Sequence, residues 1–282
     1  MRQLGRASQL LLAVAVCSLC AVLSSPTYSH PGAEHKLSHL NARIEQQPNS
    51  QSAYIQRAAL YTRTGKYVLA EQDFATAKNL GDAYLASYEL GAYYFKISDY
   101  PSAIRQFDSY LAHYPNHYPS LEYRAKAYEK VGEIEQAFKD FGVFLQQSPY
   151  TNPGHYLAVA RIALSLPHQK DPLADAINIL DDGLSKTGNS PQLQAFAIEL
   201  ELRRGFFSQA IARQESLREM TSASPQWHVE MADILVKSLQ QDQALNHLKQ
   251  GQHKLATYKN TPARQKLLLR IEKMQHAIEA AS

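Results

Sequence analysis

Residues 84–117 read YLASYELGAYYFKISDYPSAIRQFDSYLAHYPNH, and this stretch decides the fold. In its first half, apolar or small residues recur every three or four positions, at Ser87, Leu90, Gly91 and Tyr94. That spacing is typical of one face of an α-helix. The same spacing returns in the second half, at Tyr100, Ala103, Phe107, Tyr110 and Leu111. The stretch therefore predicts two amphipathic helices that pack against each other as a hairpin.

The same pattern recurs on both sides of this stretch. Segments that begin at Gln51, Tyr84 and Tyr118 start 33 and 34 residues apart. When they are aligned, an alanine column and a phenylalanine column run through all three: Ala70, Ala103, Ala137 and Phe74, Phe107, Phe141. Small residues let two helices approach closely, and the aromatic column fills the space beside them. A third column, Gly65, Gly132 and Gly205, lies between the predicted helices and suits a helix end with positive φ.

These columns resemble the tetratricopeptide repeat, whose 34-residue unit carries W-x2-L-G-x2-Y, then A-x3-F, then P. The segment from 84 matches it at Leu90, Gly91, Tyr94, Ala103, Phe107 and Pro115, with Ser87 where the family has Trp. The resemblance covers nearly the whole chain after the first thirty residues and weakens after residue 150. It implies an all-α fold, a right-handed α-solenoid of helical hairpins, and it is almost silent about function.

The register predicts how the chain is divided. We expect an N-terminal cap helix in 30–50, about six repeats, and a C-terminal capping helix in 260–282. The repeats are expected at 51–83, 84–117, 118–151, 152–190, 191–224 and 225–259. The fourth is divergent because prolines bracket an insertion at 166–172, which is either a tolerated surface loop or a functional one. No length is left for a separate catalytic domain.

The first residues are typical of an export signal. Arg2 and Arg6 precede an apolar run over 10–23 that is short for a membrane-spanning helix, which needs ~20 residues. Cleavage after Ser29 is preferred to cleavage after Ser24, and an uncleaved anchor is the alternative. Cleavage would remove both cysteines, two of the 29 basic residues and none of the 26 acidic ones, for a net charge of +1. We therefore expect an exported protein, periplasmic or secreted, with no stable membrane insertion after cleavage.

The resemblance also implies where a partner would bind. In the family, the first helix of each unit lines a concave face at positions 2, 5, 6, 9, 12 and 13. Here these positions, with two flanking residues, are Arg63, Leu85, Tyr88, Glu89, Ala92, Phe95, Lys96, Glu122, Tyr123, Lys126, Glu129, Lys130 and Tyr156. Aromatic residues beside mixed charges suit an extended peptide. Fifteen of the 17 tyrosines lie between 54 and 156, some of them in core columns.

Other kinds of chemistry find little support in the sequence. The Lys and Asn clamp by which some family members bind C-terminal carboxylates is absent, because Ile55, Ala59 and Glu89 occupy its columns. Catalytic, cofactor and phosphate-binding motifs are missing, so we expect no catalytic residue and no cofactor. His35 and His39 lie one helical turn apart without a third ligand, so no metal site is expected. Near-neutral charge and export argue against nucleic-acid binding.

The sequence thus favours a non-enzymatic adaptor or assembly scaffold in the cell envelope, with a protein or peptide partner held in the concave groove. Tyr88, Phe95, Tyr123 and Lys126 are the expected principal contacts. A passive structural spacer or a homo-oligomer is the alternative. An all-α enzyme acting on the cell wall or on glycans is the less favoured third possibility.

Overall fold

The computed structural model describes residues 31–167 and 169–281, and within these ranges the chain forms helices and no strand. The helices are α1 (Pro31–Gln46), α2 (Gln51–Arg63), α3 (Tyr67–Leu80), α4 (Tyr84–Lys96), α5 (Tyr100–His113), α6 (Tyr118–Val131), α7 (Ile134–Gln147), α8 (Pro153–Ala163), α9 (Pro172–Thr187), α10 (Pro191–Arg204), α11 (Phe207–Ser216), α12 (Arg218–Thr221), α13 (Pro225–Lys237), α14 (Gln241–Ala256) and α15 (Pro262–Ala281). The expected signal at 1–29 lies outside the described residues. Among the helices described, none combines the length and apolar character needed to cross a membrane.

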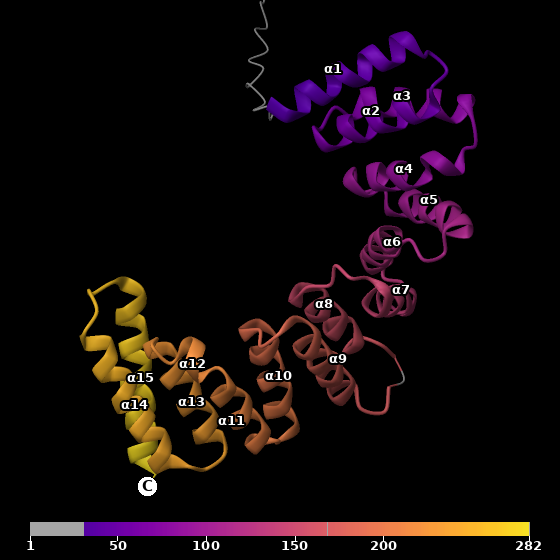
Figure 1. The fold of residues 1–282 in the computed structure, drawn as a ribbon. Coiled ribbons are helices and arrows are strands. Elements are labelled where there is room, and N and C mark those ends of the chain that lie inside the picture. Colours follow the sequence, from indigo (N-terminus) through magenta and orange to yellow (C-terminus); the bar gives the residue numbers. More distant parts are fainter. Residues whose placement is uncertain (1–30, 168, 282) are drawn as a thin grey trace, which may run out of the picture.

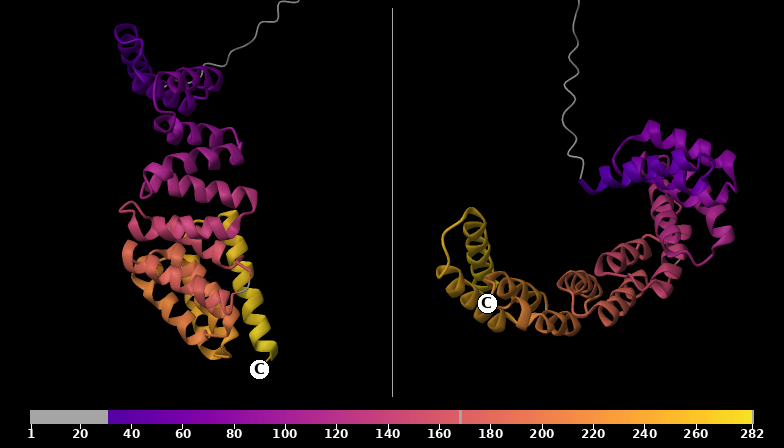
Figure 2. Two further views of the ribbon diagram at one scale, coloured as in Figure 1. Left: turned by 90° about the vertical axis from the view of Figure 1, so that its right-hand side faces the viewer. Right: turned by 45° about the horizontal axis from the view of Figure 1, so that its top comes forward.

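Consecutive helices pair as antiparallel hairpins, and the hairpins follow one another in an open arc (Figure 1). The first helices α4, α6 and α8 lie on the inner side of the arc, and their partners α5, α7 and α9 lie on the outer side. Figure 2 shows the same arc from two further directions, with each hairpin stacked on its neighbours. The prediction of an all-α array of helical hairpins is confirmed.

The turn inside each hairpin depends on one residue in the left-handed backbone region. Gly65, Gly132 and Gly205 have φ angles of 76°, 83° and 76°, as their column predicted. Ser98 and Leu239 occupy the same register position and are also left-handed, with φ angles of 65° and 61°. Residues with a Cβ adopt this conformation at a cost, so the turn geometry is imposed by the hairpin rather than by its sequence.

In the second and fourth hairpins, a small residue on one helix lies under a large ring on the other. A Cβ added to Gly91 would come within 2.7 Å of the Phe107 ring, and one added to Gly183 within 2.6 Å of the Tyr156 ring. Phe107 and Tyr156 are both fully buried. The small and aromatic columns of the sequence therefore form the contact on which the two helices close.

In the first and third repeats, an arginine of the first helix links the two helices of its hairpin and the helix before them. Arg57 on α2 makes two hydrogen bonds of 2.7 and 2.8 Å to Asp73 on α3, and donates a third to Asn41 on α1. Arg124 on α6 repeats this arrangement with Asp140 on α7 and with Asp108 on α5 of the preceding hairpin. Charged side chains thus fix both the hairpin and its contact with the previous one.

A related network in the fifth repeat places its charges the other way round. Arg213 on the second helix, α11, binds Glu201 on α10 at 2.7 Å and Asp181 on α9 at 2.7 Å. Burial raises the pKa of Glu201, and its hydrogen bond to Arg213 opposes that rise. The network again connects one hairpin to the one before it.

The insertion in the fourth repeat is a loop between Ala163, where α8 ends, and Pro172, where α9 begins. Asp171 caps α9 by accepting a hydrogen bond from the Ala174 amide, and it also pairs with Arg204 of α10 at 2.9 Å. The end of the loop is therefore attached to the next hairpin.

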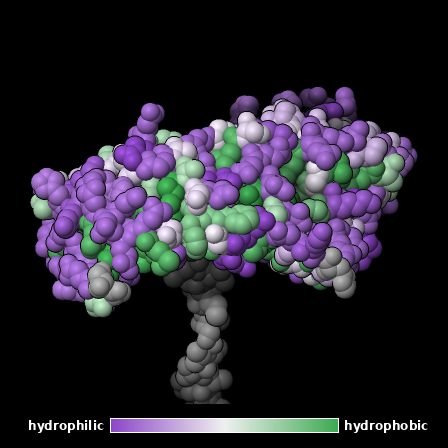
Figure 3. Space-filling view, turned by 90° about the horizontal axis from the view of Figure 1, so that it is seen from below, coloured by the Kyte–Doolittle hydropathy of each residue, from purple (hydrophilic) through white to green (hydrophobic). Residues whose placement is uncertain are grey.

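The face of the array that is seen from below is mostly hydrophilic. Viewed from below, apolar side chains appear as separate patches among polar ones rather than as one continuous face (Figure 3). Scattered apolar residues of this kind are ordinary on a soluble surface.

Candidate binding groove

The expected aromatic lining residues of α4 and α6 contact one another. The Tyr123 ring stacks on Phe107 with centroids 5.8 Å apart and contacts Phe95 edge-on at 5.4 Å. Tyr88 lies 6.5 Å from Tyr123 and contacts Tyr110 and His117 as well. We call Tyr88, Phe95, Phe107, Tyr110 and Tyr123 the aromatic cluster. Its members on α4 and α6 are only half buried, so part of each side chain is exposed while the ring contacts hold it in place.

Burial changes the acidity of the phenol at the centre of this cluster. Desolvation, reinforced by the carboxylate of Glu89 and by neighbouring phenols, raises the pKa of Tyr88 to about 12. The hydroxyl is therefore a neutral hydrogen-bond donor over the whole physiological pH range.

A charged network borders the aromatic cluster on α6. Lys126 pairs with Glu122 at 2.5 Å, and its ammonium lies 5.9 Å from the centre of the Tyr123 ring. His155 Nδ1 accepts a hydrogen bond from the Asn152 amide, so a neutral His155 carries its proton on Nε2, which lies 3.3 Å from Glu122. The hydrogen bond from His155, followed by that from Lys126, lowers the pKa of Glu122 to about 2. The carboxylate is ionised and already partnered.

Glu89 lies in a different environment at the N-terminal end of the groove. It lines a cavity of about 430 Å³ together with Arg63 and the α1 residues His35 and His39. Burial raises the pKa of Glu89, and the charge of Arg63 opposes the rise. In the ranges that the structure describes, no three His, Cys, Asp or Glu side chains are placed to hold a metal ion.

The remaining expected lining residues divide into exposed and buried. Arg63, Leu85, Lys96, Glu129 and Lys130 are exposed, and Ala92 is half buried between them. The prediction for Tyr156 is wrong, because this residue is fully buried and cannot line the groove. The fourth repeat has Gly183 opposite it, so the Tyr156 ring fills the space that a side chain at 183 would occupy.

The sequence interpretation did not extend the lining to the last repeats, where the structure contains a cavity. It has a volume of about 620 Å³ and lies between α10 and α13, and residues of α11 and α12 complete its lining. Its lining includes the same register positions as in the earlier repeats, namely Gln192, Ala195, Glu199 and Leu202 on α10 and Gln226, Glu230, Asp233 and Lys237 on α13. We call this space the α10–α13 cavity.

A departure from the aromatic column accompanies this cavity. Where the first three repeats have Phe74, Phe107 and Phe141, and the fourth and sixth have leucine, the fifth has the polar residue Gln214. Its amide donates to the Trp227 carbonyl at 3.3 Å, and the Trp227 indole donates to the Gln214 carbonyl at 3.0 Å. The Gln214 side chain is thus hydrogen-bonded to α13. A phenylalanine ring at position 214 would instead pack against the neighbouring helices. This break in the column was visible in the sequence and could have signalled a cavity.

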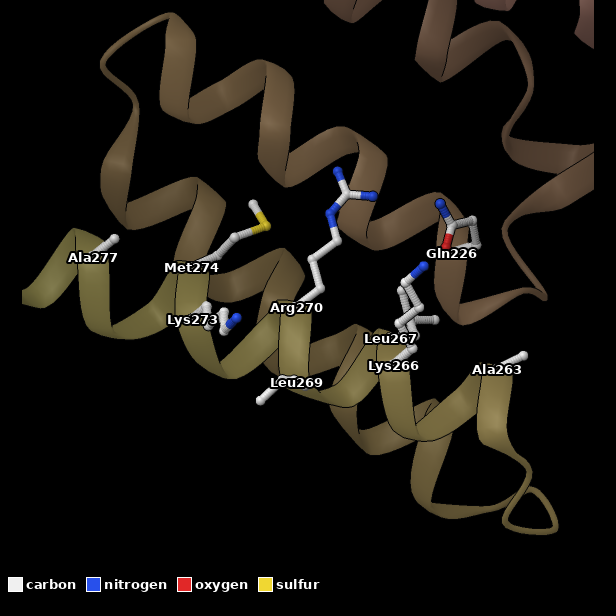
Figure 4. Close-up of a pocket in the computed structure, with 9 residues that line it drawn as sticks. All are labelled: Gln226, Ala263, Lys266, Leu267, Leu269, Arg270, Lys273, Met274 and Ala277. Atoms are coloured by element: carbon white, nitrogen blue, oxygen red, sulfur yellow. The ribbon is translucent and has the colours of Figure 1, made fainter.

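A second cavity, of about 590 Å³, adjoins the first across Gln226 and is lined mainly by α15. Figure 4 shows Arg270 and Met274 pointing from α15 into the space beside α13, whereas Leu269 points away from it. Arg270 forms an ion pair with Asp233 of α13. Lys266 and Lys273 add two further positive charges to the α15 wall.

Comparison with known proteins identifies the architecture. No family model and no curated protein matches the sequence. Among solved structures, the chain is similar to the C-terminal part of a TPR repeat-containing protein from Cytophaga hutchinsonii, at 16% identity and a TM-score of 0.64 over 83% of this chain and 94% of that one. It is also similar to the MamA protein, at 16% identity and a TM-score of 0.50 over 63% of this chain and 96% of that one. These likenesses show the tetratricopeptide-repeat fold.

Proposed function

We propose that this tetratricopeptide-repeat array is a non-enzymatic adaptor or scaffold of the cell envelope, which binds an extended segment of a partner protein along its inner face. The aromatic cluster is the observation that carries the proposal. Rings from α4 and α6 stand half exposed but are fixed by contacts of 5.4 to 6.5 Å, so little side-chain freedom is lost when a ligand covers them. Fixed aromatic area of this kind is typical of protein-binding surfaces.

Charges beside the cluster support a peptide rather than a small apolar ligand. Lys96 on α4 and Lys130 on α6 are exposed, whereas Lys126 is already paired with Glu122. Main-chain carbonyls and acidic side chains of an extended segment would find these exposed ammonium groups along the edge of the aromatic surface. The cell-envelope location rests on the export signal expected at 1–29.

The experiment is affinity capture of partners by the tagged chain from the envelope fraction of its own cells. The inner-face variant is Lys96→Glu with Lys130→Glu, which reverses two exposed charges without touching the packed rings. The matched control is Lys78→Glu with Lys139→Glu, which makes the same charge change on the outer helices α3 and α7. We expect partners to be lost from the inner-face variant alone. Equal capture by both variants would contradict binding along the inner face.

Self-association is the second candidate, and one residue favours it. Leu269 on α15 occupies the register position of Ala58, Ala125 and Ala232, which are buried against the second helix of their hairpins. Leu269 is instead 52% exposed. Light scattering at several protein concentrations tests this: a mass that rises with concentration and falls on Leu269→Lys supports a homo-oligomer, and a constant monomer mass rejects it.

A further inference from the structure

The α10–α13 cavity has an apolar floor between polar walls. Ile198 and Ile234, which face each other from α10 and α13, are 8% and 3% exposed, and Leu217 and Trp227 close the floor from beneath. The volume of about 620 Å³ is large enough for a bulky side chain with part of its main chain. An apolar floor of this kind favours an aliphatic or aromatic side chain.

The walls carry carboxylates that the described part of the chain does not neutralise. Glu199 on α10 is exposed and forms no ion pair there. Glu230 on α13 accepts hydrogen bonds only from the amides of Gln226 and Gln214, at 2.9 and 3.4 Å. Asp233 is neutralised by Arg270, and Lys237 is the cation of the lining itself. Beside the apolar floor, an occupant would therefore meet the carboxylates of Glu199 and Glu230 and the ammonium of Lys237, an excess of one negative charge.

Charges on the neighbouring helix restrict where a partner's cation can lie. The α15 wall has Lys266, Arg270 and Lys273, and α15 follows α13 in the array on the side away from α10. Repulsion from these cations disfavours a basic group on the α15 side. The favourable position is near Glu199, between α10 and α13.

We propose that the α10–α13 cavity receives a large apolar side chain of a partner segment, next to a lysine or arginine that binds Glu199 and Glu230. This inference rests on the proposed function, because it names the chemistry of the segment that the inner face binds. It adds a specificity site in the C-terminal half of the array. The aromatic cluster of α4 and α6 then supplies the more general contact area.

The test starts with a selection of random displayed peptides on the purified chain. We expect enriched peptides to have a Phe, Leu, Ile, Met or Trp adjacent to Lys or Arg. One enriched peptide is synthesised with a fluorophore, and its affinity is measured by anisotropy. Enriched peptides dominated by acidic residues would overturn the assignment of charge.

Two variants then locate the bound peptide. Ala195→Phe fills the cavity from an exposed position on α10, and Ala212→Phe is the control at an exposed position on α11 outside the lining. Glu199→Lys reverses the wall charge, and Glu135→Lys does so on the outer helix α7. We expect a loss of affinity of about tenfold or more from Ala195→Phe and from Glu199→Lys, and no loss from the controls.

The outcomes separate this inference from the proposed function. A peptide that binds equally well to Ala195→Phe overturns the cavity assignment and leaves inner-face binding intact. A peptide weakened by Ala195→Phe but not by Glu199→Lys overturns the basic neighbour alone. If the wild-type chain enriches no peptide, both the cavity assignment and the proposed binding of an extended segment are contradicted.

Discussion

The aromatic cluster on α4 and α6 and the α10–α13 cavity occupy equivalent positions in the array, yet one is filled and the other open. Around α4 and α6, Phe107 supplies a buried ring on which Tyr88 and Tyr123 pack. Around α10 and α13, the equivalent residue Gln214 turns to the Trp227 main chain, and a cavity of about 620 Å³ lies beside it. The inner face is therefore not uniform: a change in one core column accompanies the change from a fixed surface to a recess.

The comparison also distinguishes two roles of tyrosine in this chain, namely core packing and lining of the inner face. Most tyrosines lie in the first half, where they fill space between helices as well as lining the inner face. Tyr156 is wholly core, whereas Tyr88 and Tyr123 serve both purposes. Aromatic enrichment alone therefore marks packing, and exposure decides which rings remain for a partner.

Removing the buried ring around which α4 and α6 pack should have the largest effect on stability. Phe107→Ala should lower the local free energy of unfolding by about 3–5 kcal/mol, because a fully buried ring is replaced by a cavity. Gln214→Ala should cost less, about 1–3 kcal/mol, because it removes one buried hydrogen bond beside an existing cavity. Native-state hydrogen exchange resolves the two regions within one array. Equal losses at the two positions would contradict the comparison.

Breaking an ion-pair network should rank next. Arg124→Met leaves Asp140 buried and unpaired, at a cost of about 3 kcal/mol, and exchange should accelerate in both α5–α6 and α6–α7 contacts. The control Arg105→Met, at an exposed position on α5, should change stability by less than ~0.5 kcal/mol. An effect confined to the α6–α7 hairpin would show that the contact with Asp108 does not stabilise the array.

Acid should act on His228 and on Glu122 in different pH windows. His228 Nδ1 lies 3.3 Å from His247 Nδ1, and burial, then the charge of His247, lowers the pKa of His228 to about 4. Because the folded-state pKa of His228 lies below the usual 6.5, the stability that neutral His228 contributes is complete above pH 6.5 and is lost as the pH falls towards 4. The slope of the free energy of unfolding is at most ~1.4 kcal/mol per pH unit. Glu122, with a pKa lowered from 4.5 to about 2, loses its contribution only below pH 4.5.

Hydrogen exchange measured against pH checks the part that His228 plays. Exchange in α13 and α14 should accelerate between pH 6.5 and 4. Burial also lowers the pKa of His117, the N-cap of α6, so α6 should respond in the same window. His228→Gln should reduce the response in α13–α14, where burial also lowers the pKa of His247, and leave that of α6 unchanged. An unchanged response of α13–α14 in His228→Gln would exclude His228 as a cause.

The smallest expected effect comes from the hairpin turns, which occur in both halves. Ser98→Gly and Leu239→Gly should each stabilise the chain by about 1 kcal/mol, because glycine adopts the left-handed conformation without steric cost. The two sites are in different hairpins, so their effects should add. Ala212→Gly, at an exposed position in the middle of α11, should instead destabilise the chain. Denaturant midpoints measure all three, and a loss of stability in Ser98→Gly would contradict the account of the turns.

Much of the fold was predictable because the columns are local. Gly91 beneath Phe107 and Gly132 at positive φ follow from helix periodicity and from residue size, both of which the sequence displays. Left-handed Ser98 was not predictable from its side chain, because the hairpin forces that conformation on it.

The inner face was harder to predict, because exposure depends on neighbouring repeats. The register placed Tyr88 and Tyr123 together, but it also assigned Tyr156 to the groove, since one sequence cannot show that Gly183 gives this ring a buried place. The α10–α13 cavity was not predicted, because the fifth and sixth repeats have few aromatic residues at their lining positions. Gln214 in a phenylalanine column was the available signal.

The central claim is that a partner segment binds on the inner face and enters the α10–α13 cavity. Trp227 tests it most directly, because it is the chain's single tryptophan, lines that cavity and is 1% exposed. When a selected peptide is titrated into the chain, Trp227 emission should change and saturate at the concentration at which anisotropy saturates, and Ala195→Phe should abolish the change. A peptide that binds by anisotropy but leaves Trp227 emission unaltered would contradict it.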